Sequence, residues 1–294
     1  MLTRLLQRLL ILVLGVVCVW LIVFVVFKSA HNRLPFMLAV AVTYGLAAYF
    51  ILPRAVRMGL KVLKRERVPR YTITGDGLPG DPVNLLLVGT KAQLHAAFAA
   101  AGWAVADRLN VRSAWRMARA FLLNAPYPTA PFSTLYLFDR GQDVGFQKAI
   151  DDSPRKRHHV RFWALSLQHA ETTLGTSRFW RTTRRPPDDA RVIWVGAATK
   201  DIGFSLTKLT FQITHATDDD TNAEREFIMA ELSHCKAIDN RCSYQASQHV
   251  RVDHVNHYIA DGEIAAATLA AVAAEGAVDR ISMPRPIDDP DQRM

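Results

Sequence analysis

The stretch LLILVLGVVCVWLIVFVVF, residues 9–27, contains nineteen consecutive residues without a charge, and LPFMLAVAVTYGLAAYFIL, residues 34–52, repeats this property after a connector of only six residues. About 20 apolar residues allow a helix to cross a bilayer core of about 30 Å. A short polar connector suits a helical hairpin, because backbone inside lipid must satisfy its own hydrogen bonds. The sequence therefore predicts a two-helix transmembrane hairpin within residues 1–57.

A cleaved signal peptide is the alternative interpretation of the first apolar run, because Arg4 and Arg8 precede it. The run is longer than the roughly 7 to 15 apolar residues of a signal sequence, and no small-residue cleavage site follows Phe27. A second apolar run also begins almost at once. We therefore expect the first span to be retained.

The net charge of +9 is located almost entirely at the start of the chain. Residues 1–70 hold eleven Lys and Arg against the single acid Glu66, a balance of +10, which leaves −1 for residues 71–294. A nucleic-acid-binding domain would carry its positive charge on the domain itself. The sequence therefore predicts no nucleic-acid partner.

The basic residues that follow the second span indicate an orientation. Positively charged flanks of membrane helices remain in the cytoplasm, and they also attract anionic headgroups. We expect a two-span protein of the inner (plasma) membrane, with the lipid bilayer as a partner and the domain after the hairpin on the cytoplasmic side. A disulfide between Cys235 and Cys242 would require an oxidising compartment and would reverse this orientation. The sequence leaves their pairing open.

Composition divides the rest of the chain into three parts. Residues 58–80 are predicted to be a basic juxtamembrane segment and a linker, because TITGDGLPGDP, residues 72–82, is rich in Gly, Asp and Pro. Residues 81–275 have the length of one domain. Residues 276–294, rich in Pro and Asp, are predicted to be a disordered tail.

The pattern within residues 81–275 predicts a mixed α+β domain. A strand at residues 83–88 is followed by the N-cap candidate Thr90 and an Ala-rich helix at residues 91–102. Hydrophobic periodicity predicts further helices at residues 111–123 and 222–234, and strands at residues 135–138, 144–146, 159–165, 192–197 and 209–214. In residues 258–274, Asp261-Gly262 favours a β-hairpin, whereas the following alanines favour a helix. Both alternatives stay open.

The stretch PRKRHHVRFW, residues 154–163, is the first candidate site. In a strand, His159, Arg161 and Trp163 share one face, while His158, Val160 and Phe162 share the other. Arginine offers fork-shaped donors to phosphate or carboxylate, and histidine transfers protons near neutral pH. The candidate ligand-binding residues are Arg157, His158, His159 and Arg161, of which His158 and His159 are also candidate catalytic residues. The alternative is a charged edge strand that resists further pairing.

The stretch HATDDDTNAERE, residues 215–226, is the second candidate site. His215, Asp218 and Asp220 are candidate ligands of a divalent cation, since carboxylates suit Mg²⁺ or Mn²⁺. Helix capping is the favoured alternative, because Asp and Asn cap helices and acids complement the positive end of the helix dipole. The chain contains no GxSxG, HExxH or CxxC motif.

Several segments in order along the chain resemble the LssY C-terminal domain family. The resembling segments are GDPVNLLLVG (80–89), AGW (101–103), RS (112–113), APYPTAP (125–131), LYLF (135–138), DVGFQK (143–148), RHHVRFW (157–163), WVGAAT (194–199) and ER (224–225). The resemblance covers most of residues 80–270. Where the resemblance leads us to expect an acid, a proline and an acid, this chain has Asp218-Asp219-Asp220, and this departure weakens the case for a fixed ligand geometry at these residues.

The resemblance implies a domain linked to membrane modules, without an established reaction of its own. The leading hypothesis is a membrane-anchored accessory domain that binds a phosphorylated or lipid-derived ligand, or a membrane-protein partner. The alternative is a metal-assisted phosphoesterase at the membrane surface, in which a cation activates water and Arg161 holds phosphate. That alternative requires the two candidate sites to meet in space.

Overall fold

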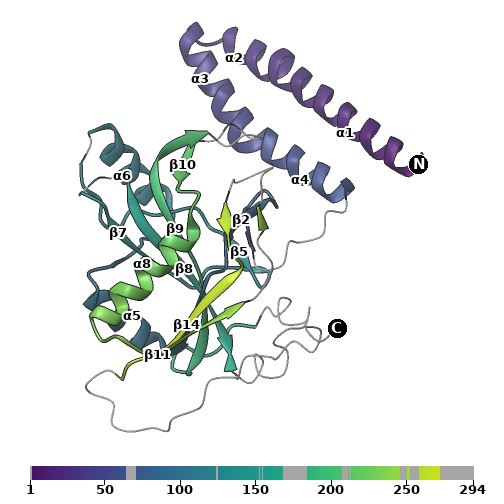
Figure 1. Ribbon diagram of the computed structural model, residues 1–294. Helices are drawn as coiled ribbons and strands as arrows, with labels where there is room; N and C mark the ends of the chain where they lie inside the picture. Colours follow the sequence, from purple (N-terminus) through teal and green to yellow (C-terminus); the bar gives the residue numbers. More distant parts are fainter. Residues whose placement is uncertain are drawn as a thin grey trace.

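The computed structural model describes residues 2–63, 71–123, 125–151, 153, 155–167, 184–206, 211, 213–245, 250–251 and 258–271. Two long apolar helices lead the chain and lie side by side in opposite directions (Figure 1). The first consists of α1 (Leu2–Trp20), the π-helical η1 (Leu21–Phe27) and α2 (Lys28–His31), and the second of α3 (Phe36–Leu46), η2 (Ala47–Ile51) and α4 (Leu52–Leu63).

Both helices are long and apolar enough to span a membrane, over Leu9–His31 and Phe36–Gly59. Two of their polar side chains, Thr43 and Arg54, donate to backbone carbonyls of the same helix. The Thr43 hydroxyl, for example, donates a hydrogen bond to the Ala39 carbonyl at 2.7 Å. This internal pairing is what lipid requires of a polar side chain in a span.

One large sheet forms the centre of the domain, with strand order β11-β14-β3-β9-β8-β7-β4. Strand β10 pairs with the last part of β9. All neighbours are antiparallel except β14 and β3. The strands are β3 (Leu85–Gly89), β4 (Ala104–Val105), β7 (Val144–Ala149), β8 (Arg157–Ser166), β9 (Val192–Leu206), β10 (Ile213–Thr217), β11 (Ile238–Gln245) and β14 (Glu263–Leu269).

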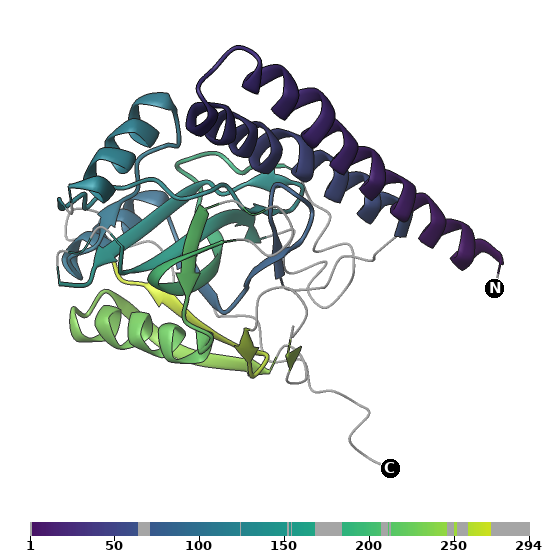
Figure 2. The same cartoon turned by 90° about the horizontal axis from the view of Figure 1, so that it is seen from above.

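Helices α5 (Lys91–Ala100) and α8 (Thr221–His234) cover one face of this sheet (Figure 2). Helix α5 begins at the predicted N-cap: Thr90 and Gln93 form a reciprocal capping box. Phe98 and Met229, one from each helix, belong to the same core as Val160 and Phe162 of β8. The even-numbered residues of β8 therefore face the helices. A third helix, α6 (Val111–Leu122), lies apart from these two.

A small sheet and a second core lie over the opposite face. The small sheet has the order β2-β1-β5-β6, formed by β1 (Tyr71–Ile73), β2 (Pro79–Pro82), β5 (Tyr136–Leu137) and β6 (Arg140–Gly141). Strand β1 and the first two residues of β2 fall within the segment expected to be a linker, and the two strands pair as a β-hairpin. Its pairing brings Asp81 into the interior of the domain, where it is 6% exposed.

Residues 258–271, the described part of the segment left open by the sequence, form two strands and no helix. Asp261-Gly262 forms a bend, and Gly262 has the positive φ of 79° that glycine tolerates. The flanking strands pair with other partners: β13 (Ile259–Ala260) with β12 (Val250–Arg251), and β14 with β11 and β3. The alanines of β14 are buried between two strands, and this tertiary pairing overrides their helix propensity. The domain is α+β, as the sequence predicted.

Candidate functional site

The register of β8 divides its polar residues between the two faces of the large sheet. His158 lies on the face covered by α5 and α8, whereas Arg157, His159 and Arg161 share the other face. The alternation expected from the sequence is therefore confirmed, and it separates His158 from the other three candidate ligand-binding residues.

Arg157, His159 and Arg161 belong to a group that we call the β8 polar cluster. Its other members come from β2, β7, β9 and the residue before β13: Asp81, Gln147, Thr199, Asp201 and Tyr258. Each member is at most 6% exposed. Buried charges of this kind are rare unless they are paired, so their partners define what the cluster can do.

Each arginine of the cluster is paired with one acid. Arg157 donates from Nε to Asp201 Oδ2 at 2.8 Å and from Nη1 to Gln147 Oε1 at 2.7 Å. Arg161 donates from Nη1 to Asp81 Oδ2. Tyr258 donates its hydroxyl proton to the other Asp81 oxygen at 2.9 Å. The two arginines and two aspartates balance in charge.

His159 lies between the two acids. Its Nε2 is 2.9 Å from Thr199 Oγ1 and 3.8 Å from Asp81 Oδ2, and its Nδ1 is 3.5 Å from Asp201 Oδ2. Thr199 stands directly opposite His159 in the register of β8 and β9. The imidazole is therefore positioned between the Thr199 hydroxyl on one side and the Asp201 carboxylate on the other.

The ring of Phe132 covers the cationic side of the cluster. Its centroid is 4.4 Å from Arg161 Cζ, 5.5 Å from Arg157 Cζ and 5.4 Å from the centroid of the His159 ring. The aromatic face attracts these guanidinium groups. Gly145 of β7 makes room for the ring, because a Cβ at that position would lie 2.2 Å from Phe132 Cζ.

Electrostatics favour the charged form of Asp81. Burial alone would raise its pKa, but the Arg161 guanidinium, His159 and the Tyr258 hydroxyl together lower the pKa to about 2. The same arrangement acts in the opposite sense on Tyr258, whose pKa rises well above its usual value because of burial and the nearby Asp81 charge. Tyr258 is therefore a neutral donor to an ionised carboxylate.

Three nitrogen atoms of the cluster have unused hydrogen-bonding capacity. Arg157 Nη2, His159 Nδ1 and Arg161 Nε are buried and have no hydrogen-bond partner among the described residues. Asp201 Oδ2 is 3.5 Å from His159 Nδ1 but accepts its hydrogen bond from Arg157 Nε, and the two Asp81 oxygens accept from Arg161 Nη1 and the Tyr258 hydroxyl. Most buried polar groups in proteins are satisfied, so three such nitrogens in one cluster suggest a functional constraint.

His158 belongs to a different arrangement on the helix side of the sheet. Its Nδ1 is 2.7 Å from Glu224 Oε2 on α8, and its ring stacks on Phe227 with centroids 4.1 Å apart. The neighbouring strands place Lys148 and Lys200 on either side of it. These lysines pair with Glu231 at 2.7 Å and Asp218 at 3.8 Å. This row of charges attaches α8 and its preceding loop to the sheet.

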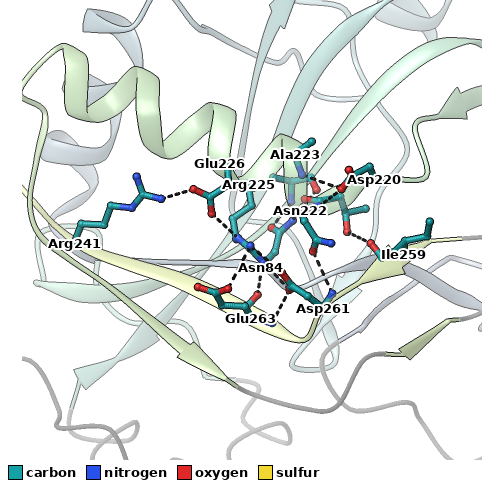
Figure 3. A network of polar contacts seen from close by, with 12 residues as sticks. Asn84, Asp220, Asn222, Ala223, Arg225, Glu226, Arg241, Ile259, Asp261 and Glu263 are labelled. Atoms are coloured by element: carbon teal, nitrogen blue, oxygen red, sulfur yellow. Dashed lines mark hydrogen bonds and ion pairs between the residues drawn. The ribbon is translucent and has the colours of Figure 1, made fainter.

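The second candidate site forms the start of α8. Asp220 accepts hydrogen bonds from the backbone N–H groups of Asn222 and Ala223, both at 3.0 Å, so the favoured capping interpretation is confirmed (Figure 3). Asp218 accepts from the Asp220 N–H at 3.1 Å. His215 lies in β10 opposite Phe204, and its side chain is outside the described part of the structure.

Neither candidate site forms a metal centre with described residues. Within the ranges that the structure describes, no three His, Cys, Asp or Glu side chains are grouped to hold a metal ion. Asp218 contacts Lys200 on the His158 face, whereas His159 and Arg161 lie on the opposite face of the sheet. The geometry thus does not bring Asp218 together with His159 and Arg161, and the cation site stays a prediction.

Arg225 connects α8 to the bend before β14. Its guanidinium donates to both carboxylate oxygens of Asp261, at 2.8 and 3.0 Å, and to the Glu263 carbonyl at 3.0 Å (Figure 3). Asp261 in turn accepts from the Glu263 N–H at 2.8 Å. This bidentate pair fixes the segment that presents Tyr258 to the β8 polar cluster.

Sequence reasoning found the arginines and histidine of the cluster but missed its acids. Asp81 stands at the expected boundary between the linker and the domain, where no strand was predicted, and Asp201 lies beyond the end of the strand predicted at residues 192–197. A signal existed for Asp201, because Thr199 and Asp201 continue the alternation of Ala197 along β9. Asp81 and Tyr258 reach the cluster only through tertiary pairing.

Fold and cluster together define a class: an α+β domain with a buried arginine, histidine and aspartate cluster, preceded by two apolar helices. The family model described as LssY C-terminus matches residues 65–264, and the chain belongs to this family. No curated protein and no solved structure matches the chain. Residues from segments that carry the resemblance, among them Asp81, Gln147 and Thr199, meet with Arg157, His159 and Arg161 in the β8 polar cluster.

Proposed function

We propose that this chain is a membrane-anchored accessory domain that binds an anionic ligand, either phosphorylated or lipid-derived, at the β8 polar cluster. The observation that carries the proposal is the set of three buried nitrogens, Arg157 Nη2, His159 Nδ1 and Arg161 Nε, that have no hydrogen-bond partner in the described residues. A phosphate or carboxylate group offers several acceptor oxygens, and arginine recognises such groups through its planar fork.

The internal pairing of the cluster explains why binding, rather than bond cleavage, is the better match. Asp81 and Asp201 neutralise the two arginines, and Asp81 is held ionised. A bound ligand would accept hydrogen bonds from the nitrogens that have no partner. It would not be needed to neutralise the arginines, because Asp81 and Asp201 already do so. Phe132 lies over both guanidinium groups, so its ring is the side chain that must move to admit a ligand.

Calorimetric titration of the full chain in detergent micelles tests the proposal. Inorganic phosphate is one probe, and phosphatidic acid in the same micelles is the other, so that a free anion and a lipid headgroup are distinguished. Arg161→Gln should weaken binding by about tenfold or more, because a charged hydrogen bond is lost. Arg161→Lys keeps the charge without the fork and should bind with an affinity between those of Arg161→Gln and the wild type.

Arg155→Gln is the matched control, since Arg155 is exposed and lies two residues before the strand. It should bind like the wild type. Thermal unfolding of each variant establishes that the protein remains folded. The proposal fails if neither probe binds the wild type, or if folded Arg161→Gln binds as tightly as the wild type.

The proposal also places the domain on the cytoplasmic side of the inner membrane, on the basis of the basic flank after the second span. Asn32→Cys, in the exposed turn between the two helices, should then react from outside intact cells with a membrane-impermeant maleimide. Cys235 and Cys242, which are thiols and not a disulfide, should react only after the cells are broken. Labelling of the two native thiols in intact cells would reverse the orientation.

A further inference from the structure

Helix α6 presents an apolar stripe to the outside of the domain. A helix of 3.6 residues per turn places Val111, Trp115, Ala118 and Leu122 along one line. Val111 is 88% exposed, Trp115 65% and Leu122 78%. Single exposed apolar residues are common on protein surfaces, but a continuous stripe on one helix marks an interaction surface.

A row of arginines follows this stripe along one flank. Arg112, Arg116 and Arg119 each come one residue after a member of the stripe, and all three are exposed. Arg116 is 3.5 Å from Asp107 and lies over the Tyr127 ring at 4.6 Å. Arg112 and Arg119 form no ion pair within the described part of the domain. The row therefore keeps uncompensated positive charge beside the apolar stripe.

The third face of α6 holds the helix firmly on the domain. Ala120 packs with Tyr127 and Ala130 in a small buried core. At the start of the helix, the Ser113 N–H donates to Asn110 Oδ1 at 2.9 Å and the Asn110 N–H donates to Ser113 Oγ at 2.9 Å. The stripe is thus displayed by a fixed helix, and its exposure does not come from a loose chain end.

A polar hollow of about 230 Å³ opens at the same end of α6. It is lined by Arg108, Arg112 and Arg116, together with Asp107, Asn110 and Ser113. Three arginines against one acid favour an anionic occupant. The hollow lies beside the apolar stripe, so a molecule with an anionic head and apolar chains could contact both.

The position of α6 in the fold agrees with contact to a membrane. In both views the helix lies on the same side of the domain as the two apolar helices (Figure 1, Figure 2). The β9–β10 hairpin adds exposed Leu206 and Phe211 to this side.

We infer that α6 is a second membrane contact, which lies in the headgroup region of an anionic bilayer with its stripe toward the acyl chains and its arginines on lipid phosphates. Helices with Trp and Leu on one face and arginines on the other bind interfaces in this way. The two apolar helices keep the bilayer within reach, which raises its effective concentration near α6. The inference does not depend on ligand binding at the β8 polar cluster.

Fluorescence of a labelled side chain tests this contact on the full chain. Leu122→Cys, with the three native cysteines changed to serine, is labelled with an environment-sensitive dye and reconstituted in vesicles. The vesicles contain phosphatidylcholine, with or without about 30% phosphatidylglycerol, and a nitroxide-labelled lipid as quencher. The dye should be quenched about twofold or more with the anionic lipid, and less without it.

Two variants control this measurement. Ala230→Cys labels an exposed position on α8, away from the apolar helices, and should not be quenched. Arg112→Glu with Arg119→Glu should abolish the quenching at position 122, because the glutamates repel anionic lipid. The inference is overturned if position 122 is quenched no more than position 230, or if the quenching is unaffected by both lipid charge and the double variant. Quenching that disappears on dilution of the protein would also overturn it, and would indicate contact between copies of the chain.

Discussion

Replacement of Asp81 by asparagine tests the electrostatic balance of the β8 polar cluster. The amide would keep the shape and one acceptor oxygen, but would remove the charge that Arg161 needs in the interior. The Asp81 pKa falls from 3.8 to about 2, and this shift corresponds to about 2 to 3 kcal/mol in the free energy of unfolding. For a domain of about 200 residues, such a loss lowers the melting temperature by roughly 5 to 10 °C.

The contribution of Asp81 to stability should decrease as the pH falls. Because folding lowers the Asp81 pKa, the carboxylate stabilises the wild type fully above about pH 5. This contribution is lost as the pH falls from about 4 toward 2. Thermal unfolding of the full chain in detergent, followed by tryptophan fluorescence, should show this loss in the wild type and a flatter profile in Asp81→Asn.

Asp76 provides a matched control on the same β1–β2 hairpin. Burial raises its pKa, and Arg57, at 3.8 Å, offsets this only in part. Asp76→Asn should therefore leave the melting temperature near neutral pH unchanged or slightly higher. The reasoning is refuted if Asp81→Asn melts within about 1 °C of the wild type near neutral pH, or if its profile below about pH 4 follows that of the wild type.

Three further substitutions test other contacts by the same melting measurement. Gly145→Ala should lower the melting temperature by several degrees, because its Cβ would lie 2.2 Å from Phe132 Cζ. Gly145→Ala combined with Phe132→Ala should destabilise by less than the sum of the two single changes, and simple additivity would contradict the proposed clash. Asp220→Ala should remove about 1 kcal/mol by uncapping α8, while Asp220→Asn should restore most of it, and equal loss in both would argue against capping. Arg225→Lys should be destabilising because lysine cannot pair with both Asp261 oxygens at 2.8 and 3.0 Å; a melting temperature equal to that of the wild type would show that the fork is dispensable.

The sequence predicted well what depends on local pattern. The apolar runs, the capped helix after Thr90, the helix that begins after Asp220 and the alternation of β8 all follow from residues within a few positions of one another. The features that the sequence left open or missed depend on partners that are distant in sequence. The alanines of β14 form a strand because β3 and β11 pair with them, and the β1–β2 hairpin is ordered by its place beside β5.

The sequence predicted only those residues of the candidate site that follow a local pattern. Arg157, His159 and Arg161 stand on one strand, and a period of two places them together. Their partners arrive from four other segments, and Asp81 is 80 residues from Arg161 in the chain. The sequence carries no local signal for a pair as distant as Asp81 and Arg161. The face of β8 was therefore predictable, whereas its neutralisation by internal acids was not.

Residues 71–294 have a net charge of −1, but their arginines are of two kinds. Arg157, Arg161 and Arg225 are buried and paired with aspartates, so their charge is used inside the domain. Arg112 and Arg119 remain exposed beside the stripe of α6. A domain with almost no net charge can therefore still present a cationic surface, because many of its acids are engaged in internal pairs. The location of each acid, rather than the total charge, decides where an anionic partner can bind.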